Sequence, residues 1–324
     1  MKRGKVLFAL FCVCSGCWFD GGTLGGFPLG PWHGHQPGSS SPDAGTTESD
    51  AGATDAAIND AAINDAGNDA DIDEDAGPED AGASDAAIPR VLRVMPVGDS
   101  IVAGYTDNPT WSVPFNFGWR SGLYKLLQAA YPDRLQYVGS SLEPWESPFG
   151  NLVDAAFLSP DLRALDQDHH HGYGAVGTYE IAIQLLDWLD RDPPDVVLLM
   201  IGINDIPAGS SDEPVQAELN LEWMVNAIVD RLPNADVVVA QITPYSVHTE
   251  AIVMFNHYIR DVIIPNVSAR TNKVRTVDQY PALLGSEGID PALFANGINH
   301  PSPEAYERMA KIWFEGLVPI FDRP

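Results

Sequence analysis

Residues 93–101 have the sequence Arg93-Val94-Met95-Pro96-Val97-Gly98-Asp99-Ser100-Ile101. The apolar first part, with its β-branched residues, is typical of a buried strand, and it ends abruptly in Gly-Asp-Ser. Gly98 permits a sharp turn, which would bring Ser100 to the carboxyl edge of a sheet, where ligands of open α/β sheets bind. Ser100 is therefore a candidate nucleophile, although a serine that only caps the end of a strand would have the same local pattern.

Strand-like and helix-like segments alternate from residue 90 onward. Short runs of aliphatic and β-branched residues predict strands, and apolar residues three or four positions apart predict helices. Strands that alternate with helices form a parallel sheet covered on both faces, so the sequence predicts an α/β fold with a five-stranded parallel sheet. The predicted strands are residues 91–97, 135–139, 195–201, 236–242 and 274–277, and the predicted helices are residues 119–131, 177–190, 214–232, 250–264 and 302–317.

The segment of residues 18–89 differs in composition from the rest. It is first rich in Gly and Pro and then in Asp and Ala, and no Lys or Arg occurs between Lys5 and Arg90. Such a segment has few large apolar groups to bury and repels itself, which predicts a disordered acidic linker. Residues 90–324 are then the folded domain.

Residues 1–17 predict an export signal, because a basic start is followed by a short apolar run. Ser15-Gly16-Cys17 resembles the lipobox of bacterial lipoproteins, which implies that Cys17 is lipidated and tethers the protein to the cell envelope. Cleavage of an ordinary secretory signal is the alternative, and it also exports the protein. All three cysteines lie in this segment, so the domain has none for a disulfide or a metal site.

The net charge of the chain is −27 at pH 7. Nucleic acids and anionic membranes repel a protein of this charge. We therefore expect no nucleic-acid partner, and contact with a membrane only through an N-terminal lipid.

Three further segments would reach the same sheet edge as Ser100. Gly202-Ile203-Asn204-Asp205 follows a predicted strand, and the Asn204 amide could donate to a developing oxyanion, although Gly and Asn also suit an ordinary turn. The glycine-containing residues 169–177 lead into a helix, where backbone N–H groups could be further donors. His300 precedes the last predicted helix and could be a general base.

Together these segments resemble the blocks of the SGNH (GDSL-type) hydrolase superfamily. The resemblance implies a flavodoxin-like three-layer sandwich and a serine esterase that needs no cofactor and no metal. The blocks are Gly98-Asp99-Ser100, the loop near Gly174, residues 202–205 and His300. Within the superfamily the chain is most similar to acetylxylan-esterase-like carbohydrate esterases, in residues 93–100, 118–120, 166–169 and 240–244.

The resemblance implies an enzyme that hydrolyses small acyl esters, acetyl esters above all, on polysaccharide through an acyl-enzyme. Two alternatives stay open: a lipase or lysophospholipase on the same scaffold, and a carbohydrate-binding surface protein without catalysis. The implied nucleophile is Ser100 and the implied base is His300. The implied oxyanion hole consists of the Ser100 and Gly174 backbone N–H groups and the Asn204 side chain. The loop does not align cleanly with the family, so other backbone donors remain open: Gly172, Ala175 and Gly177.

The family usually has an acid three or four residues before the histidine, where this chain has Gly297 and Asn296. The predicted site is therefore a dyad of Ser100 and His300, with the imidazole oriented by a backbone carbonyl or by Asn296. The alternative is that an acid such as Asp290 reaches the ring. A histidine of ordinary pKa would stop acting as a base below about pH 6.

Two further groups have more than one interpretation. His169, His170 and His171 could suggest a metal site, but consecutive side chains of an extended segment point to opposite sides, and no further ligands lie at a suitable spacing. We therefore predict no metal. The side chains of Trp111, Trp119 and Trp145 are consistent both with a platform that stacks on sugars and with packing in the core.

Overall fold

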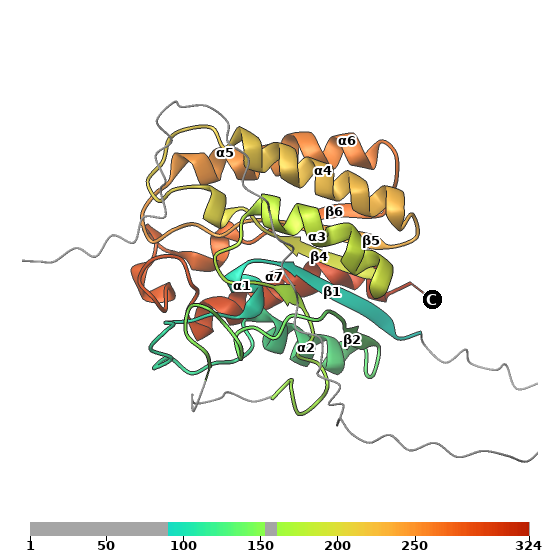
Figure 1. The fold of residues 1–324 in the computed structure, drawn as a ribbon, viewed down its shortest axis with the longest axis horizontal. Helices are drawn as coiled ribbons and strands as arrows, with labels where there is room; N and C mark the ends of the chain where they lie inside the picture. Colours follow the sequence, from blue (N-terminus) through green and yellow to red (C-terminus); the bar gives the residue numbers. More distant parts are fainter. Residues whose placement is uncertain (1–89, 153–160, 324) are drawn as a thin grey trace, which may run out of the picture. The chain divides into compact units, whose positions relative to one another are not determined.

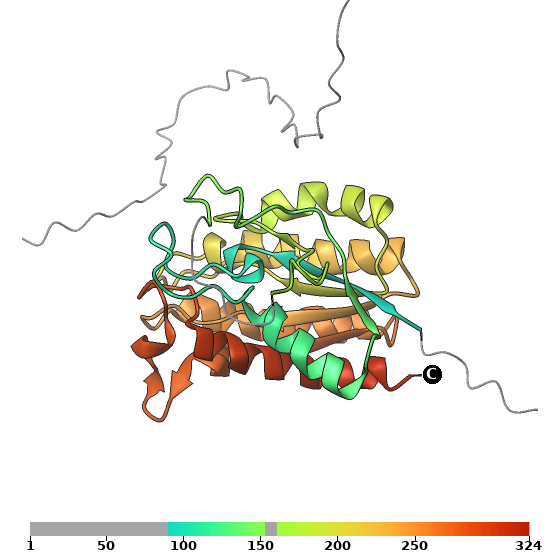
Figure 2. The same ribbon diagram turned by 90° about the horizontal axis from the view of Figure 1, so that it is seen from below.

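The computed structural model describes residues 90–152 and 161–323. The predicted export signal, Cys17 and the predicted linker of residues 18–89 lie outside the described residues. The described part forms three layers, with a parallel sheet between two layers of helices (Figures 1 and 2). This is the predicted flavodoxin-like α/β sandwich.

The sheet has five main strands, all parallel, in the order β2-β1-β4-β5-β6. All five residues of β4 are buried, which agrees with the nearly continuous apolar run in the sequence. Each fully buried Val or Leu of such a strand contributes about 1.5–3 kcal/mol relative to an exposed one. The strands are β1 (Leu92–Gly98), β2 (Leu135–Tyr137), β4 (Val196–Met200), β5 (Asp236–Gln241) and β6 (Val274–Asp278).

The helices cover the sheet in two groups. On one face lie α2 (Trp119–Ala130) and α7 (Pro303–Phe321), and on the other lie α3 (Thr178–Arg191) and α4 (Val215–Arg231), as Figure 2 shows. The connection from β5 to β6 contains α5 (Glu250–Tyr258) and α6 (Ile264–Ser268), joined by a π-helical turn. Because the strands are parallel, α3 and α4 run back against them, and both helices begin at the carboxyl edge of the sheet.

The predicted elements are confirmed, with differences at short elements and at helix ends. The antiparallel pair β7 (Leu284–Gly285) and β8 (Gly288–Ile289) was not predicted. A two-residue strand, β3 (His171–Gly172), pairs with the end of β1 and was not predicted, because two residues show no periodicity. The predicted helix of residues 250–264 continues to Ser268 through the π-helical turn. Helix α7 passes the predicted end at residue 317 and includes Pro319, since Ile320 and Phe321 are buried and hold its last turn against the core. Within the described part of the chain, no helix is both long and apolar enough to cross a bilayer.

Candidate active site

Ser100 is the first residue of a short helix, α1 (Ser100–Ala103), directly after β1. Gly98 is required before it, because a Cβ at that position would lie 1.9 Å from the carbonyl oxygen of Met200 in the neighbouring strand. The carboxylate of Asp99 accepts a hydrogen bond of 2.9 Å from the Ile101 N–H and so caps α1. Burial raises the pKa of Asp99 to about 7. The strand end and the cap together fix Ser100 at the carboxyl edge of the sheet.

His300 lies against Ser100. Its Nε2 is 2.9 Å from Ser100 Oγ, and its Nδ1 is 2.9 Å from the carbonyl oxygen of Thr106. A carbonyl oxygen can only accept, so Nδ1 carries the ring proton and Nε2 accepts from the serine hydroxyl. Burial lowers the pKa of His300 to about 4, partly offset by the Thr106 carbonyl, so the ring is neutral at pH 7. This is the geometry of a nucleophile and its general base.

The loop before His300 is organised by Asn296. The side-chain oxygen of Asn296 accepts three hydrogen bonds of 3.0 Å, from the N–H groups of Ile298, Asn299 and His300. Its amide donates to Asn299 Oδ1 at 3.0 Å. A backbone carbonyl and Asn296 were the two groups predicted to orient the imidazole. The group in contact with the ring is a backbone carbonyl, that of Thr106, so the prediction that Asn296 orients the ring is wrong. Asn296 instead shapes the loop that carries the ring.

Asp290, the alternative acid, is engaged elsewhere. Its carboxylate accepts a hydrogen bond of 2.9 Å from the Ala292 N–H and caps a 3₁₀ turn at Pro291–Leu293. The Thr106 carbonyl accepts from Nδ1 of His300, so among the described residues the hydrogen-bond partner of this nitrogen is a carbonyl and not a carboxylate. Thr106 was missed by the sequence analysis, because a backbone carbonyl has no residue-type signal.

The predicted oxyanion donors do not all have a free N–H. The Gly174 N–H donates to Glu143 Oε2 at 2.6 Å, so the prediction that Gly174 is a donor to the oxyanion is wrong for this geometry. The Ser100 N–H, at the start of α1, has no partner among residues 90–152 and 161–323. Asn204 Nδ2 donates to the Val176 carbonyl at 2.9 Å, which leaves the second N–H of that amide for another acceptor.

The other loop donors can be compared in the same way. The Gly172 N–H donates to His170 Nδ1 at 2.9 Å, and the Gly177 N–H donates to Glu180 Oε2 at 3.0 Å. The N–H of Ala175 has no hydrogen-bond partner in the described ranges, and Ala175 is exposed in a left-handed conformation with φ of 58°. Ala175 is thus the loop residue whose N–H is available to a ligand.

The loops that carry these donors are tied to each other. The Asp205 carboxylate accepts from the Thr178 N–H at 2.9 Å and from the Thr178 hydroxyl at 2.8 Å. Together with the bond from Asn204 to Val176, this joins the turn after β4 to the loop before α3. The structure therefore brings Asn204 and residues 174–177 together, as predicted from the order of the elements.

Arg120 supports the helix that carries Ser100. Its guanidinium is buried and donates to the carbonyl oxygens of Val102 at 3.2 Å, Ala103 at 3.2 Å and Asp168 at 2.7 Å. Burial lowers its pKa to about 10, which still leaves the group charged at pH 7. A single cation thus satisfies the carbonyl end of α1 and links it to the segment before β3.

The three consecutive histidines have separate partners. His169 lies 3.2 Å from the Gly139 carbonyl oxygen, His170 Nε2 donates to the Glu143 carbonyl at 2.8 Å, and the His171 ring stacks on Trp188 with 4.2 Å between ring centroids. No group of three or more His, Cys, Asp or Glu side chains that could hold a metal ion occurs in the described part of the chain.

The three tryptophans have different surroundings. Trp119 is fully buried and packs against Trp313 with 5.1 Å between ring centroids, so it belongs to the core. Trp111 is also buried, and its indole N–H donates to the Gly150 carbonyl at 3.3 Å. Trp145 is half-buried, with the Arg163 guanidinium 4.7 Å from its ring centroid. Core packing therefore accounts for Trp119, and Trp145 is the one of the three that is only partly buried.

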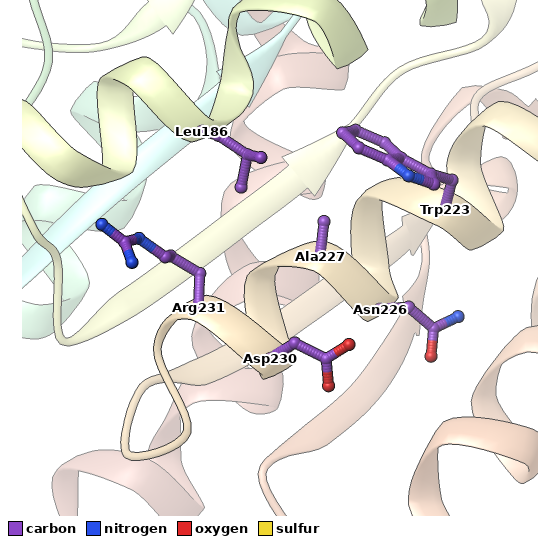
Figure 3. Close-up of a pocket in the computed structure, with 6 residues that line it drawn as sticks. All are labelled: Leu186, Trp223, Asn226, Ala227, Asp230 and Arg231. Carbon is purple, nitrogen blue, oxygen red and sulfur yellow. The ribbon is translucent and has the colours of Figure 1, made fainter.

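A surface groove of about 420 Å³ lies between α3 and α4 (Figure 3). Both helices begin at the carboxyl edge of the sheet, whereas the groove involves their second halves, so it is separate from the Ser100 site. It is lined by Leu186, Trp223, Asn226, Ala227, Asp230 and Arg231.

Residues 97–308 match the sequence model of the GDSL-like Lipase/Acylhydrolase family. The chain belongs to this family. The match includes the Gly-Asp-Ser turn and His300, and it confirms the resemblance to SGNH (GDSL-type) hydrolases. Residues 97–308 are therefore a GDSL-type esterase domain.

Solved structures of carbohydrate esterases are similar to this esterase. The family 3 carbohydrate esterase of Clostridium thermocellum is 26% identical, with a TM-score of 0.52, over 72% of this chain and 98% of that one. A family 3 carbohydrate esterase from Talaromyces cellulolyticus is 20% identical, with a TM-score of 0.53, over 71% of this chain and 98% of that one, and supports the fold.

A multidomain esterase of Ruminococcus flavefaciens is 23% identical to this chain over 247 residues, which are 70% of the chain. The chain spans only 28% of the length of that relative. The similarity therefore concerns one part of a larger protein.

Proposed function

We propose that this esterase removes small acyl groups, acetyl in particular, from polysaccharides. The observation that carries the proposal is the contact of 2.9 Å between Ser100 Oγ and His300 Nε2, with Nδ1 held by the Thr106 carbonyl. The similarity to the carbohydrate esterase of Clostridium thermocellum supports a sugar ester as the substrate.

In the first step, Ser100 Oγ attacks the acyl carbonyl carbon. The hydroxyl proton moves to Nε2 of His300, and the electron pair of the carbonyl bond moves onto the oxygen. The Nδ1 proton stays on the ring, where it is held by the Thr106 carbonyl. The imidazolium thus formed has a dipole rather than a carboxylate as its partner, which stabilises it less.

The oxyanion that forms is stabilised by the N–H groups of Ser100 and Ala175 and by the second N–H of Asn204. These groups lie at the ends of different elements, and the contacts between Asn204 and Val176 and between Asp205 and Thr178 hold them in place. A positioned donor of this kind contributes about 3–4 kcal/mol to stabilisation of the transition state.

In the second half of the reaction, the bond between the acyl carbon and the sugar oxygen breaks, and Nε2 returns its proton to that oxygen. The acyl group is then bonded to Ser100. Water attacks it while Nε2 accepts a proton, and the carboxylic acid leaves as Ser100 regains its hydroxyl. These residues complete the cycle without a cofactor.

We further propose that the esterase is exported and tethered through a lipid on Cys17. The support is the sequence of residues 1–17, with a basic start, an apolar run and small residues before the cysteine. In a producing bacterium, Cys17→Ser should move the protein from the membrane fraction to the soluble fraction. A wild-type protein that is already soluble would favour the secreted alternative.

The decisive experiment is acetate release from a panel of acetylated polysaccharides, with wild type beside Ser100→Ala. We expect the variant to lose at least about a thousandfold in kcat/KM while it keeps the wild-type circular dichroism spectrum. Glycan binding without acetate release would favour the carbohydrate-binding alternative. Full activity of the Ser100→Ala protein would contradict the mechanism.

A lipase on the same scaffold is favoured by one feature of the His300 loop. Ile298 and Val247 are about half exposed, at 55% and 52%, and their loops are joined by a bond of 2.7 Å from the Ser246 N–H to the Ile298 carbonyl. Such a pair could contact a long acyl chain. A series of p-nitrophenyl esters from acetate to palmitate separates the two functions, because a lipase prefers the long esters.

A further inference from the structure

Glu143 lies between the two segments that carry the proposed machinery. Its Oε2 accepts a hydrogen bond of 2.6 Å from the Gly174 N–H and one of 2.8 Å from the Tyr105 hydroxyl. Its own carbonyl accepts from His170 Nε2 at 2.8 Å. One side chain therefore joins the loop before α3 to the segment that follows α1.

On the first side, Glu143 acts on the residue next to the oxyanion donor. The bond to the Gly174 N–H fixes the peptide plane before Gly174, and the direction of the next N–H, that of Ala175, depends on it. The fit is close, because a Cβ on Gly174 would lie 3.1 Å from the Tyr105 hydroxyl and 3.2 Å from Glu143 Oε2. Movement of the carboxylate would therefore be transmitted to the loop.

On the second side, Tyr105 connects Glu143 to the nucleophile and the base. The Tyr105 N–H donates to the Ser100 carbonyl at 2.9 Å, and the Tyr105 ring centroid is 5.7 Å from that of His300. The next residue, Thr106, supplies the carbonyl that holds Nδ1. The Tyr105 hydroxyl also shares a hydrogen bond with Ser147, so the tether includes the segment that carries Glu143.

We infer that Glu143 is a positioning residue of this esterase. Through one acceptor oxygen it fixes the positions of the Ala175 N–H and the Thr106 carbonyl relative to each other. The inference rests on the proposed roles of Ser100 and His300. The two groups bonded to Glu143 Oε2, the Gly174 N–H and the Tyr105 hydroxyl, are both donors, so the role requires an acceptor rather than a negative charge. Burial raises the pKa of Glu143, and the Gly174 N–H and the Tyr105 hydroxyl oppose that rise. Burial of a charged carboxylate costs free energy, so a carboxyl group at this buried position is consistent with a functional role.

The test uses p-nitrophenyl acetate and three variants of the full chain. Glu143→Ala removes the acceptor and should lower kcat about tenfold to a hundredfold, with KM within about twofold of wild type, because misplacement of catalytic groups by about 1 Å costs rate rather than ground-state binding. Glu143→Gln keeps an acceptor oxygen and should stay within about threefold of wild type. Glu146→Gln, a change to an exposed carboxylate of the same segment, should behave as wild type.

Tyr105→Phe is a second test of the inference, for use if circular dichroism shows that Glu143→Ala is unfolded. It removes one of the two bonded donors and should lower kcat at least about threefold without a change in KM. Three results would overturn the inference. The first is an unchanged kcat in Glu143→Ala, or in Tyr105→Phe if Glu143→Ala does not fold. The second is a loss of kcat in Glu143→Gln as large as that in Glu143→Ala, and the third is a rise in KM without a fall in kcat. Ser100→Ala, assayed beside them, tests the proposed function separately, because its full activity would refute that function whatever the Glu143 variants do.

Discussion

The carbonyl oxygen of Thr106 lies 2.9 Å from Nδ1 of His300 and orients this ring, the proposed general base. The family pattern expects a carboxylate in the same role. A peptide dipole fixes the tautomer and the ring plane as a carboxylate would, but it adds no charge. The consequences appear first in the dependence of activity on pH.

The pH profile of kcat/KM should extend further into acid than an ordinary histidine would allow. Burial lowers the pKa of His300 to about 4, and the base must be neutral to accept the serine proton, so activity should persist at pH 5 and fall by half near pH 4. This replaces the expectation of a fall below about pH 6 for an ordinary histidine. The measurement is kcat/KM from pH 3.5 to 8, with circular dichroism at each pH to show that the protein is folded. A midpoint near 6.5 would mean that the ring is more solvated than the structure indicates.

Asn296→Ala should weaken catalysis through the loop rather than through the ring. It removes the acceptor for three backbone N–H groups, those of Ile298, Asn299 and His300. We expect kcat to fall about tenfold and the free energy of unfolding to fall by about 1–3 kcal/mol. Steady-state kinetics and urea denaturation check the two effects. Wild-type kcat in a folded Asn296→Ala protein would show that the loop keeps its shape without this side chain.

Arg120→Lys should destabilise the fold although it keeps the charge. Three carbonyl oxygens lie around the guanidinium, and a lysine ammonium is a point donor that cannot reach all of them. We expect the free energy of unfolding to fall by about 2–4 kcal/mol in urea denaturation. Arg231→Lys, at an exposed arginine, is the matched control and should leave the midpoint unchanged. Equal midpoints for both variants would mean that the carbonyls near Arg120 find other donors.

Ala175→Gly should stabilise the protein and preserve its activity. Ala175 has a φ of 58°, a conformation that glycine adopts at less cost than alanine, and the substitution keeps the backbone N–H. We expect a gain of about 0.5–1 kcal/mol in the free energy of unfolding, with kcat within about twofold of wild type. Thermal unfolding and kinetics measure both quantities. A large loss of kcat would show that the alanine methyl group itself contacts the substrate.

Sequence patterns predicted most of the fold because burial leaves a strong signal. The continuous apolar run of β4 and the helical spacing in α2 and α3 gave the correct element types, and the order of the elements placed Ser100, Asn204 and His300 at one edge. The signal was weakest where an element is very short, as in β3, or where buried neighbours outweigh a helix breaker, as at Pro319.

The sequence predicted the contact between Ser100 and His300, but it left open which main-chain groups surround them. Ser100 and His300 have distinctive chemistry, so their residue types were informative. The choice among the loop N–H groups depended on which of them were already bonded, for example that of Gly174 to Glu143, and such pairing follows from tertiary contacts alone. Glu143 itself has no motif around it, and its position between two loops is visible only after folding.

The group that orients the imidazole belongs to the main chain. Any amino acid at position 106 presents the same oxygen, so no single codon change there can delete it, whereas an orienting aspartate is lost by one substitution. This orientation of the imidazole can therefore be lost only by a change in the path of the polypeptide at position 106. The selective constraint then falls on the residues that set that path.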